Sequence, residues 1–306
     1  MARELKSSSF KVRKAVIPAA GLGTRFFPAT KTVPKEMLPI VDRPTILYVI
    51  EEAIQAGIED IILIQGRGKT AIEDFFDISY ELEDKLIKDG KEDVLKQINF
   101  IRNNINIISI RQKAALGLGH AIKCAESVTG DQPFAVLLGD EITISKDKDH
   151  NITNYLIQNC EKNQSSGVWV LPIEAHETHK YGIVDLGSQL QNTPTQELAG
   201  GQKVKGVVEK PTTQAAPSLW ALPGRYVFQP EIMTYLNEIK QGVNGEYQLS
   251  DAMNLLAQKS NLMAYSFTTR RFDAGDKLGF LLANIELALE RPDLKEGLLK
   301  YLKGKI

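Results

Sequence analysis

The segment of the sequence best suited to chemistry is a loop that combines glycine with positive charge. Gly21 and Gly23 are followed by Arg25, Lys31 and Lys35. Closely spaced glycines let backbone N–H groups approach a phosphate without obstruction by Cβ atoms. Arginine offers phosphate oxygens a bidentate fork, whereas lysine acts as a compact charge. Because a solvated basic loop would have the same composition, this segment by itself favours neither a phosphate site nor a solvated loop.

Acidic residues follow two apolar segments at positions that suit a metal ion. Asp140 and Glu141 follow the run 135–138, and Asp273 follows Phe272. A carboxylate just beyond a strand of an α/β sheet lies where such a protein would hold Mg²⁺. An isolated aspartate is more often a helix N-cap or a turn residue. Each carboxylate alone is therefore a weak signal.

A third apolar run ends in a charged pair, Glu209-Lys210, which is fixed by Pro211. With the glycine loop and the aspartates, this pair completes an inventory of carboxylates, cations and a phosphate-binding loop. That combination is typical of Mg²⁺-assisted phosphoryl or nucleotidyl transfer.

Two familiar nucleotide motifs are absent. A dinucleotide fingerprint would require a small residue at position 26, where Phe26 stands. The Gly68-Lys69-Thr70 sequence resembles part of a P-loop, but the upstream glycine would fall at Leu63, inside an apolar run. We therefore predict that residues 68–70 form a solvated turn.

The elements that position these residues follow an alternating pattern. We predict a buried strand over 14–18, a functional loop over 19–41, a helix from about Pro44 to Gly57 and a strand over 60–64. A strand, a helix and a strand in so short a stretch form a βαβ unit, so part of the sheet is parallel. We also predict strands at 105–110, 134–138 and 167–171, helices at 119–128, 152–160, 231–239, 249–259 and 278–290, an exposed helical insertion at 80–102 and an antiparallel subdomain at 181–209.

Composition limits the function further. The 306 residues contain 37 Lys plus Arg and 38 Asp plus Glu, which argues against binding to duplex nucleic acid. Cys124 and Cys160 are expected to be buried, reduced thiols. Residues 1–14 lack the apolar segment of a secretory signal, and no apolar run is long enough to span a bilayer. We expect a cytoplasmic protein without nucleic-acid or membrane partners.

Several motifs together resemble the sugar-1-phosphate nucleotidylyltransferases. The glycine loop continues into Pro34-Lys-Glu-Met-Leu-Pro39, a motif that is similar to the one in the uridylyltransferase branch of that family. Further matches occur in family order and cover residues 15 to about 290: Arg111-Gln112 with Leu116-Gly-Leu-Gly-His120, Tyr181-Gly-Ile-Val184, Val208-Glu-Lys-Pro211, Gly245-Glu-Tyr-Gln-Leu-Ser-Asp-Ala252 and Asp273-Ala-Gly-Asp-Lys277.

The resemblance implies a fold and a reaction. The fold would be an α/β, Rossmann-like, doubly wound mixed sheet, mainly parallel, with a small antiparallel sugar-binding subdomain and C-terminal helices. Residues 1–290 would be the catalytic domain, with a nucleotide half at about 12–145 and a sugar-phosphate half at about 146–275. Residues 276–306 would be a C-terminal helical segment that contributes an oligomer contact in a homodimer or homotetramer.

In the implied reaction, a phosphate oxygen of glucose 1-phosphate attacks the α-phosphorus of UTP in line. UDP-glucose forms and pyrophosphate leaves, with Mg²⁺ as cofactor and no covalent enzyme intermediate. Two alternatives stay open: thymidylyl transfer to the same sugar phosphate, and a catalytically silent nucleotide-sugar-binding homologue. Uracil and thymine differ by one methyl group, worth only about 1–3 kcal/mol in a pocket.

The resemblance also assigns roles to individual residues. Arg25 and Lys35 would neutralise the triphosphate and the leaving group, and Lys210 would hold the sugar phosphate. Asp140 and Asp273 would bind Mg²⁺, and the role of Glu141 is left open. The remaining implied contacts are Ala20, Gly21, Gly23, Glu36, Gln112 and Gly117 for the nucleotide, and Gly182 and Glu209 for the sugar.

Two further expectations concern residues near these sites. None of the four histidines is required for the reaction, and we expect His120, which opens a helix beside the base-binding loop, to be structural. The Gln- and Gly-rich segment 188–202 gives no catalytic signal, and we expect it to be a mobile loop beside the sugar site.

Overall fold

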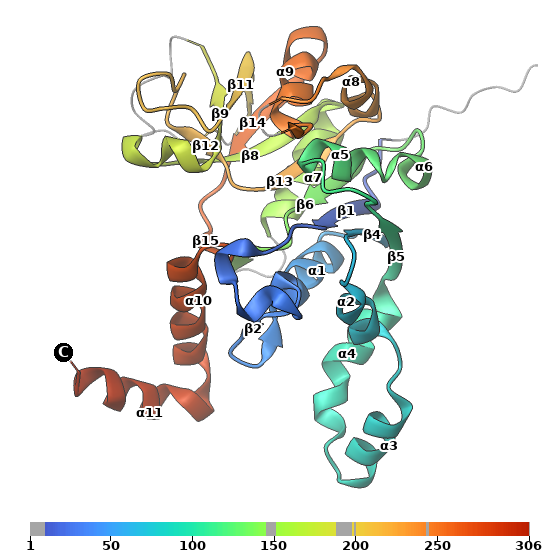
Figure 1. The fold of residues 1–306 in the computed structure, drawn as a ribbon, viewed down its shortest axis with the longest axis vertical. Coiled ribbons are helices and arrows are strands. Elements are labelled where there is room, and N and C mark those ends of the chain that lie inside the picture. The colour runs from blue at the N-terminus through green and yellow to red at the C-terminus, as the bar shows by residue number, and fades with distance from the viewer. Residues whose placement is uncertain (1–9, 145–150, 188–197, 199, 243–244, 306) are drawn as a thin grey trace, which may run out of the picture.

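The computed structural model describes residues 10–144, 151–187, 198, 200–242 and 245–305 (Figure 1). Its centre is an eleven-stranded sheet in which nine strands follow the order β11-β9-β12-β8-β13-β6-β1-β4-β5, while β14 pairs with β8 and β10. These strands are β1 Lys14–Ala19, β4 Asp60–Gln65, β5 Asn106–Arg111, β6 Phe134–Leu137, β8 Ser166–Pro172, β9 Gly182–Asp185, β10 Gln202–Lys203, β11 Gly206–Glu209, β12 Trp220–Leu222, β13 Arg225–Phe228 and β14 Leu262–Ser266.

One half of the sheet is parallel and reverses its winding direction at β1. Strand β1 pairs in parallel with β4 on one side and with β6 on the other, and β4 pairs in parallel with β5. The chain therefore builds outward from β1 in one direction and then returns to its other side. In such sheets, ligands bind in the crevice at the carboxyl ends of the strands where the order reverses. Here that crevice lies beyond Ala19 of β1 and Leu137 of β6.

Both faces of the parallel half are covered by helices, because alternate residues of each strand point to opposite sides. Val16 joins a core with α5, α8 and α9, whereas Ala15 and Ile17 join a second core with α1, α2, α4 and α7. The helices are α1 Thr45–Gln55, α2 Thr70–Phe76, α3 Tyr80–Lys88, α4 Glu92–Asn104, α5 Leu118–Lys123, α6 Glu126–Thr129, α7 Ile152–Asn163, α8 Ile232–Glu238, α9 Leu249–Lys259, α10 Lys277–Glu290 and α11 Pro292–Lys303.

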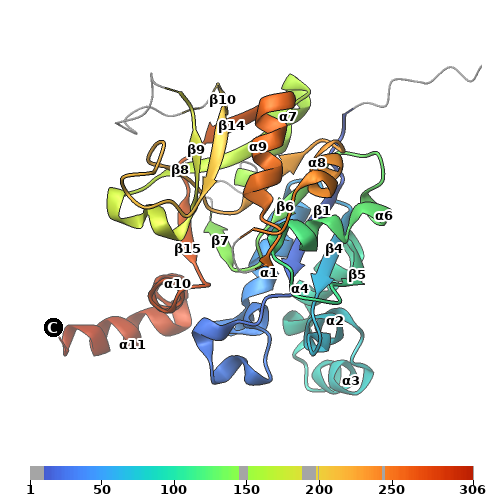
Figure 2. The ribbon, with the colours of Figure 1, turned by 45° about the horizontal axis from the view of Figure 1, so that its top comes forward.

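The other half of the sheet is largely antiparallel, with β11, β9 and β12 at its edge. Two small sheets lie apart from it: β7 (Glu141–Ile144) pairs with β15 (Arg270–Asp273), and β2 (Pro39–Ile40) pairs with β3 (Arg43–Pro44). In Figures 1 and 2, β15 leads from the upper sheet into α10, and α11 then reaches away from the rest of the chain. None of the helices described here is long and apolar enough to cross a bilayer.

The α/β fold class with a mixed sheet and a small antiparallel part is confirmed. The βαβ start and helix α9 are where the sequence placed them, and the insertion at 80–102 contains α3 and α4. One expected helix, 119–128, is instead two, α5 and α6, because the chain turns at Ala125, whose N–H donates to the carbonyl of Ile122. The sequence patterns missed α2 and the short strands β2, β3, β7, β12, β13, β14 and β15, whereas α11 falls in the C-terminal helical segment expected at 276–306.

Two other expectations need comment. Cys160 is buried as expected, but Cys124 is only partly buried because its side chain lies beside a cavity lined by His120 and Tyr247. The expected mobile loop at 188–202 lies mostly outside the described residues. The division of the chain into a catalytic domain and a C-terminal segment stays a prediction.

Candidate active site

The glycine loop leaves β1 at the point where the sheet reverses its order. Ala20 is buried, and Gly21 is exposed beside it. Gly23 has φ of 66°, and a Cβ there would lie 3.1 Å from the Thr30 side chain, so only glycine fits without strain. The Thr30 hydroxyl donates to the Gly23 carbonyl at 2.7 Å. These constraints fix the path of the loop and leave Gly21 open to solvent.

The loop then returns to the strand ends through a short 3₁₀ turn, Lys35–Met37, which carries a cation to the end of β6. The Lys35 ammonium donates to Asp140 Oδ2 and forms an ion pair with it. Burial alone would lower the pKa of Lys35, but the Asp140 carboxylate raises it above its ordinary value. Burial likewise opposes ionisation of Asp140, yet Lys35 holds the pKa of Asp140 below its ordinary value. Both groups are therefore charged at neutral pH.

A second carboxylate reaches the same point through the pairing of β7 with β15. The register places Asp273 opposite Glu141, and the Ala274 N–H donates to the Asp140 carbonyl at 2.8 Å. Gly275 lies between the two acids: a Cβ there would be 2.5 Å from Asp140 Oδ2 and 3.1 Å from Asp273 Oδ1. Burial and the nearby Asp140 charge both raise the pKa of Asp273. Two like charges thus face a small space that no side chain fills.

This arrangement suits a hard divalent cation. Mg²⁺ is commonly held by one or two carboxylates, with substrate phosphates and water completing its shell. Asp140 and Asp273 place two such carboxylates beside Gly275. Within the described ranges, no group of three or more His, Cys, Asp or Glu side chains could hold a metal. The donor set is therefore of the kind that a phosphate substrate completes.

A second ion pair lies behind the glycine loop and is fully buried. Glu36 is 0% exposed, and its Oε2 accepts a hydrogen bond from the Lys69 ammonium at 2.8 Å. The predicted solvated turn at 68–70 is therefore wrong for Lys69, which is only 7% exposed, because the Glu36 carboxylate compensates its charge inside the protein. Glu36 Oε1 is buried and has no hydrogen-bond partner among the residues that the structure describes. Burial raises the pKa of Glu36 against the opposing effect of Lys35 and Lys69.

Gln112, which the resemblance assigned to the nucleotide, is held by a tight turn. It follows β5, is only 6% exposed, and its Nε2 donates to the Gly117 carbonyl at 3.2 Å. Gly117 has φ of 94°, and a Cβ there would lie 2.8 Å from the Tyr247 carbonyl oxygen. Only glycine permits both the turn and this close packing. The two residues that the sequence assigned to the base are therefore in contact.

The sugar-side residues come from the antiparallel edge of the sheet. The β9–β11 register places Glu209 opposite Gly182, and a Cβ on Gly182 would lie 3.4 Å from Glu209 Oε2. Lys210 has φ of 43°, which is uncommon for a residue with a side chain, and its N–H donates to the Tyr181 carbonyl at 3.1 Å. The Lys210 ammonium is exposed and lies 3.6 Å from Glu209 Oε1. A charged pair is thus presented at the end of β11.

A cavity of about 280 Å³ is lined both by the two aspartates and by the residues predicted for the sugar phosphate. Its walls include six of the residues that the sequence predicted: Arg25, Asp140, Gly182, Glu209, Lys210 and Asp273. Arg25 also donates to the Gly275 carbonyl at 3.2 Å, which ties the glycine loop to the second carboxylate. The residues predicted to bind the nucleotide lie outside this cavity, and so does Lys35. The nucleotide residues are Ala20, Gly21, Gly23, Glu36, Gln112 and Gly117. Lys31 is exposed and also lies outside it.

The site therefore combines a glycine loop, paired carboxylates and cations on a doubly wound sheet. The family model described as "Nucleotidyl transferase" matches residues 14–288. This chain belongs to the nucleotidyl transferase family. A UTP–glucose-1-phosphate uridylyltransferase of Bacillus subtilis (strain 168) is 48% identical over 294 residues, covering 96% of this chain and 97% of that protein.

Solved structures of nucleotidyl transferases resemble this nucleotidyl transferase as well. A UTP-bound UGPase from Acinetobacter baumannii superposes with a TM-score of 0.85 at 40% identity, covering 95% of this chain and 98% of that one. A UDP-glucose pyrophosphorylase complexed with UDP-glucose superposes with a TM-score of 0.81 at 39% identity, covering 92% and 100%. The likeness therefore extends over nearly the whole nucleotidyl transferase fold.

Glu141, whose role the sequence left open, is buried and paired with an arginine, although it lines the same cavity as the two aspartates. Its carboxylate is bound by Arg271, whose Nη2 donates to Glu141 Oε2 at 2.9 Å and whose Nε donates to Oε1. Arg271 also donates to the Tyr181 hydroxyl at 3.3 Å. In this nucleotidyl transferase, Arg271 thus connects Glu141, next to Asp140, to Tyr181, which directly precedes β9.

Three charged residues of this nucleotidyl transferase site escaped the sequence patterns: Lys69, Arg225 and Arg271. Arg225 stands in an apolar run, Tyr226 to Phe228 following it, and a charge in such a run is a signal of a buried ion pair. Arg271 is adjacent to the Phe272-Asp273 motif, and strand alternation would place it opposite to Phe272. Lys69 had no such signal, since Gly68 beside it is typical of an exposed turn.

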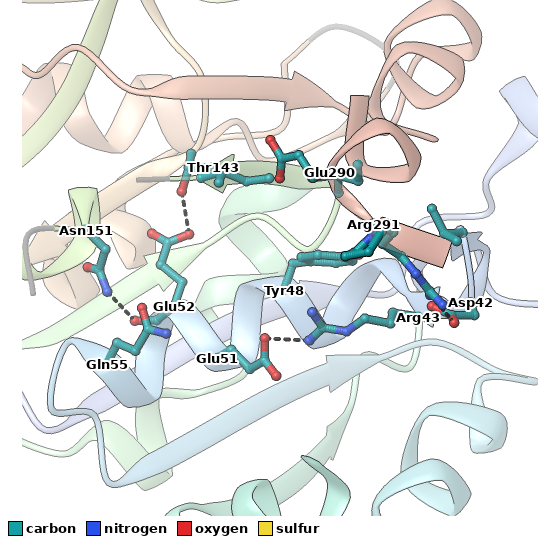
Figure 3. A pocket seen from close by; sticks show the side chains of 14 residues that line it. Asp42, Arg43, Tyr48, Glu51, Glu52, Gln55, Thr143, Asn151, Glu290 and Arg291 are labelled. Carbon is teal, nitrogen blue, oxygen red and sulfur yellow. Dashed lines mark hydrogen bonds and ion pairs between the residues drawn. The ribbon is translucent and has the colours of Figure 1, made fainter. Parts of the chain in front are cut away.

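A second cavity of about 410 Å³ lies on the other side of the Asp140 segment, between α1 and the start of α11. Figure 3 shows Glu52 there, with the Thr143 hydroxyl donating to its carboxylate at 2.7 Å. Two pairs of charged groups on its walls are bonded to each other: Arg43 to Glu51 and Arg291 to Asp42. Glu52 lines this cavity and also contacts Arg225, which binds the backbone next to Asp140 in the nucleotidyl transferase.

Proposed function

We propose that this chain transfers the uridylyl group of UTP to glucose 1-phosphate, giving UDP-glucose and pyrophosphate. The observation that carries the proposal is the convergence of Asp140 and Asp273 on one small space that opens into the cavity shared with Glu209 and Lys210. A site for metal-assisted chemistry on phosphate thereby adjoins a charged pair suited to a sugar phosphate. The uridylyltransferase names of relatives up to 48% identical support this substrate pair over thymidylyl transfer.

The proposed roles of the side chains follow from their positions. Arg25, at the mouth of the cavity, neutralises charge on the triphosphate and on the departing pyrophosphate. Lys35 reaches the same region while paired with Asp140. Lys210 binds the phosphate of glucose 1-phosphate, and Glu209 accepts hydrogen bonds from glucose hydroxyls. With both substrates fixed, a phosphate oxygen of the sugar is in line with the α-phosphorus, and the reaction needs no covalent enzyme intermediate.

Asp140 and Asp273 are the proposed ligands of Mg²⁺. The ion, when bound, neutralises charge that develops on the phosphates during transfer. Lys35 donates to Asp140 and holds the carboxylate in its ionised form, which is the form that binds a metal. Gly275 leaves room between the two acids, because any side chain there would displace Asp140.

The nucleotide would lie against the glycine loop on the other side of the carboxylates. The exposed backbone at Gly21 and the buried Ala20 form one wall, and Gln112 with Gly117 forms the other. Glu36 Oε1, which is buried and has no partner within the described part of the chain, is an acceptor for a hydroxyl of the nucleotide. Backbone and amide groups of this kind recognise a pyrimidine by its hydrogen-bond donors and acceptors rather than by its size.

The test is pyrophosphate release from UTP, dTTP, ATP, GTP and CTP with glucose 1-phosphate and Mg²⁺. Preference for UTP is expected. Preference for dTTP would leave the proposed mechanism unchanged but would show that the nucleotide substrate is dTTP and not UTP. Release from no nucleotide by folded protein would replace the proposed enzyme with a binding homologue. Galactose 1-phosphate in parallel reactions measures how strictly the sugar is read.

We also propose a homodimer or homotetramer that uses residues 276–306. Leu278, Leu281 and Leu282 of α10 are 65%, 56% and 45% exposed, and α11 reaches away from the sheet (Figure 2). An exposed apolar patch of this kind is typical of a subunit contact. Light scattering during size-exclusion chromatography would measure the mass, and Leu281→Lys should reduce it. Because the substrates are cytoplasmic metabolites, we propose that the protein acts in the cytoplasm.

A further inference from the structure

The amide of Gln112 has a single orientation that its neighbours allow. Its Nε2 donates to the Gly117 carbonyl at 3.2 Å and lies 2.9 Å from His120 Nδ1. A carbonyl oxygen only accepts hydrogen bonds, so the NH₂ group must be on this side of the amide. Both amide hydrogens are then used within the protein. The carbonyl oxygen, Oε1, is the part of the amide that is left for a ligand.

The same geometry fixes the state of His120. Because the amide nitrogen only donates, His120 Nδ1 must accept, which requires a neutral ring with its proton on Nε2. Burial, assisted by the charge of Lys123, lowers the pKa of His120 and so favours the neutral ring. The imidazole is therefore in the one form that can hold the Gln112 amide.

The ring is itself held in place by the segment before α9. The Tyr247 ring stacks on His120 with centroids 6.2 Å apart and an angle of 28° between the planes. The Tyr247 carbonyl accepts from the Gly119 N–H at 2.9 Å, and its N–H donates to the Leu116 carbonyl at 2.8 Å. The start of α5, which carries His120, is thus attached to a second segment at two points, and the Tyr247 ring limits the movement of the imidazole.

We infer that His120 is a specificity-determining positioning residue, which with Gly117 holds Gln112 so that Oε1 accepts a hydrogen bond from N3–H of uracil. This inference rests on the proposed function and extends it to a residue that the sequence assigned only to structure. Uracil carries a hydrogen on N3, whereas N3 of cytosine carries a lone pair that would repel Oε1. Without His120, only the Gly117 carbonyl holds the amide, so the turned-over amide, which presents its NH₂ group and suits cytosine, becomes less unfavourable.

The experiment compares kcat/KM for UTP with kcat/KM for CTP. His120→Phe keeps a ring against Tyr247 but removes the acceptor, and should lower the UTP/CTP ratio by about tenfold. His120→Asn restores a side-chain oxygen near the position of Nδ1 and should keep most of the ratio. Cys124→Ala is the matched control, because Cys124 Sγ lies 3.9 Å from the same Nδ1 but does not touch Gln112.

The outcomes separate positioning from packing. Equal losses for UTP and CTP in His120→Phe, with the ratio unchanged, would show that His120 only packs the loop and would overturn the inference. If that variant does not fold, His120→Leu provides the same comparison. A wild-type enzyme that does not prefer UTP over CTP contradicts the proposed function instead, so the two failures are distinguishable.

Discussion

Arg225 and Glu52 form a buried ion pair across 173 residues of sequence: Arg225 Nε donates to Oε1 at 3.0 Å and Nη2 to Oε2 at 2.7 Å. The same guanidinium donates to the carbonyls of Leu138 at 3.2 Å and Glu141 at 2.6 Å. These carbonyls flank Asp140, so the pair holds the backbone of the proposed metal ligand from behind. Glu52 is held in turn from the second cavity by Thr143 (Figure 3).

Arg225→Met should therefore destabilise the fold strongly. Arg225 is 1% exposed, and removal of one partner from a buried ion pair leaves an uncompensated charge that costs about 3–5 kcal/mol. Urea denaturation would measure the loss in the free energy of unfolding. Arg43→Met is the matched control, because Arg43 pairs with Glu51, the residue next to Glu52 on α1. That pair is partly exposed, and an exposed pair contributes only about 0–1 kcal/mol. Similar losses in both variants would contradict the special position of Arg225.

Lys69→Met should destabilise the protein in a pH-dependent way. The pKa of Glu36 is already raised by burial above its ordinary 4.5, and loss of the Lys69 charge and hydrogen bond raises it further. A carboxyl whose pKa is higher in the folded state than in the unfolded state destabilises the fold increasingly as pH rises above the unfolded value. The deficit should therefore be small at pH 5 and grow to a few kcal/mol by pH 8.

Urea denaturation of Lys69→Met at both pH values would measure this trend. The double variant Lys69→Met with Glu36→Gln is the control, since it removes both charges and should lose the pH dependence. A deficit that is the same at both pH values would mean that the Lys69 side chain contributes only packing.

Asp140→Asn should abolish most turnover while the fold is retained. The amide cannot supply the negative charge that the proposed Mg²⁺ site requires, so activity should fall by orders of magnitude. Binding of Mn²⁺, followed by electron paramagnetic resonance of the free ion, should weaken in parallel. Asp276→Asn is the control: Asp276 caps α10, accepting from the N–H groups of Leu278 and Gly279, and lies only three residues after Asp273. Near-normal activity of Asp140→Asn would remove the assignment.

Lys210→Ala should weaken the binding of glucose 1-phosphate far more than the binding of UTP. The ammonium is exposed at the sugar end of the cavity, beside Glu209, and has no buried role to lose. Steady-state kinetics with each substrate varied in turn would measure the two KM values. Lys180→Ala serves for comparison, because Lys180 lines the same cavity but is paired with Glu177. Equal increases in both KM values for Lys210→Ala would point to a general electrostatic effect.

Local sequence patterns were sufficient for the parallel half of the fold. Strand β1, helix α1 and strand β4 have strong apolar periodicity, short connections and a glycine at the helix end, so each is determined by nearby residues. The glycine loop, Asp140 and Asp273 were recognisable because their motifs require particular residue types at fixed spacing. Strands β7 and β15 were missed because each is four residues long and is stabilised by a partner about 130 residues away.

The sequence by itself determined the family, the α/β class and the residues that chemistry on phosphate would use. Only the tertiary structure decided how these residues are held: Lys69 buried against Glu36, and His120 bonded to Gln112. It also placed Arg225 behind Asp140. The physical reason is that a buried charge or amide is stable only when distant parts of the chain satisfy it. Such pairs leave no local period or spacing, because the partners meet only when the sheet is assembled.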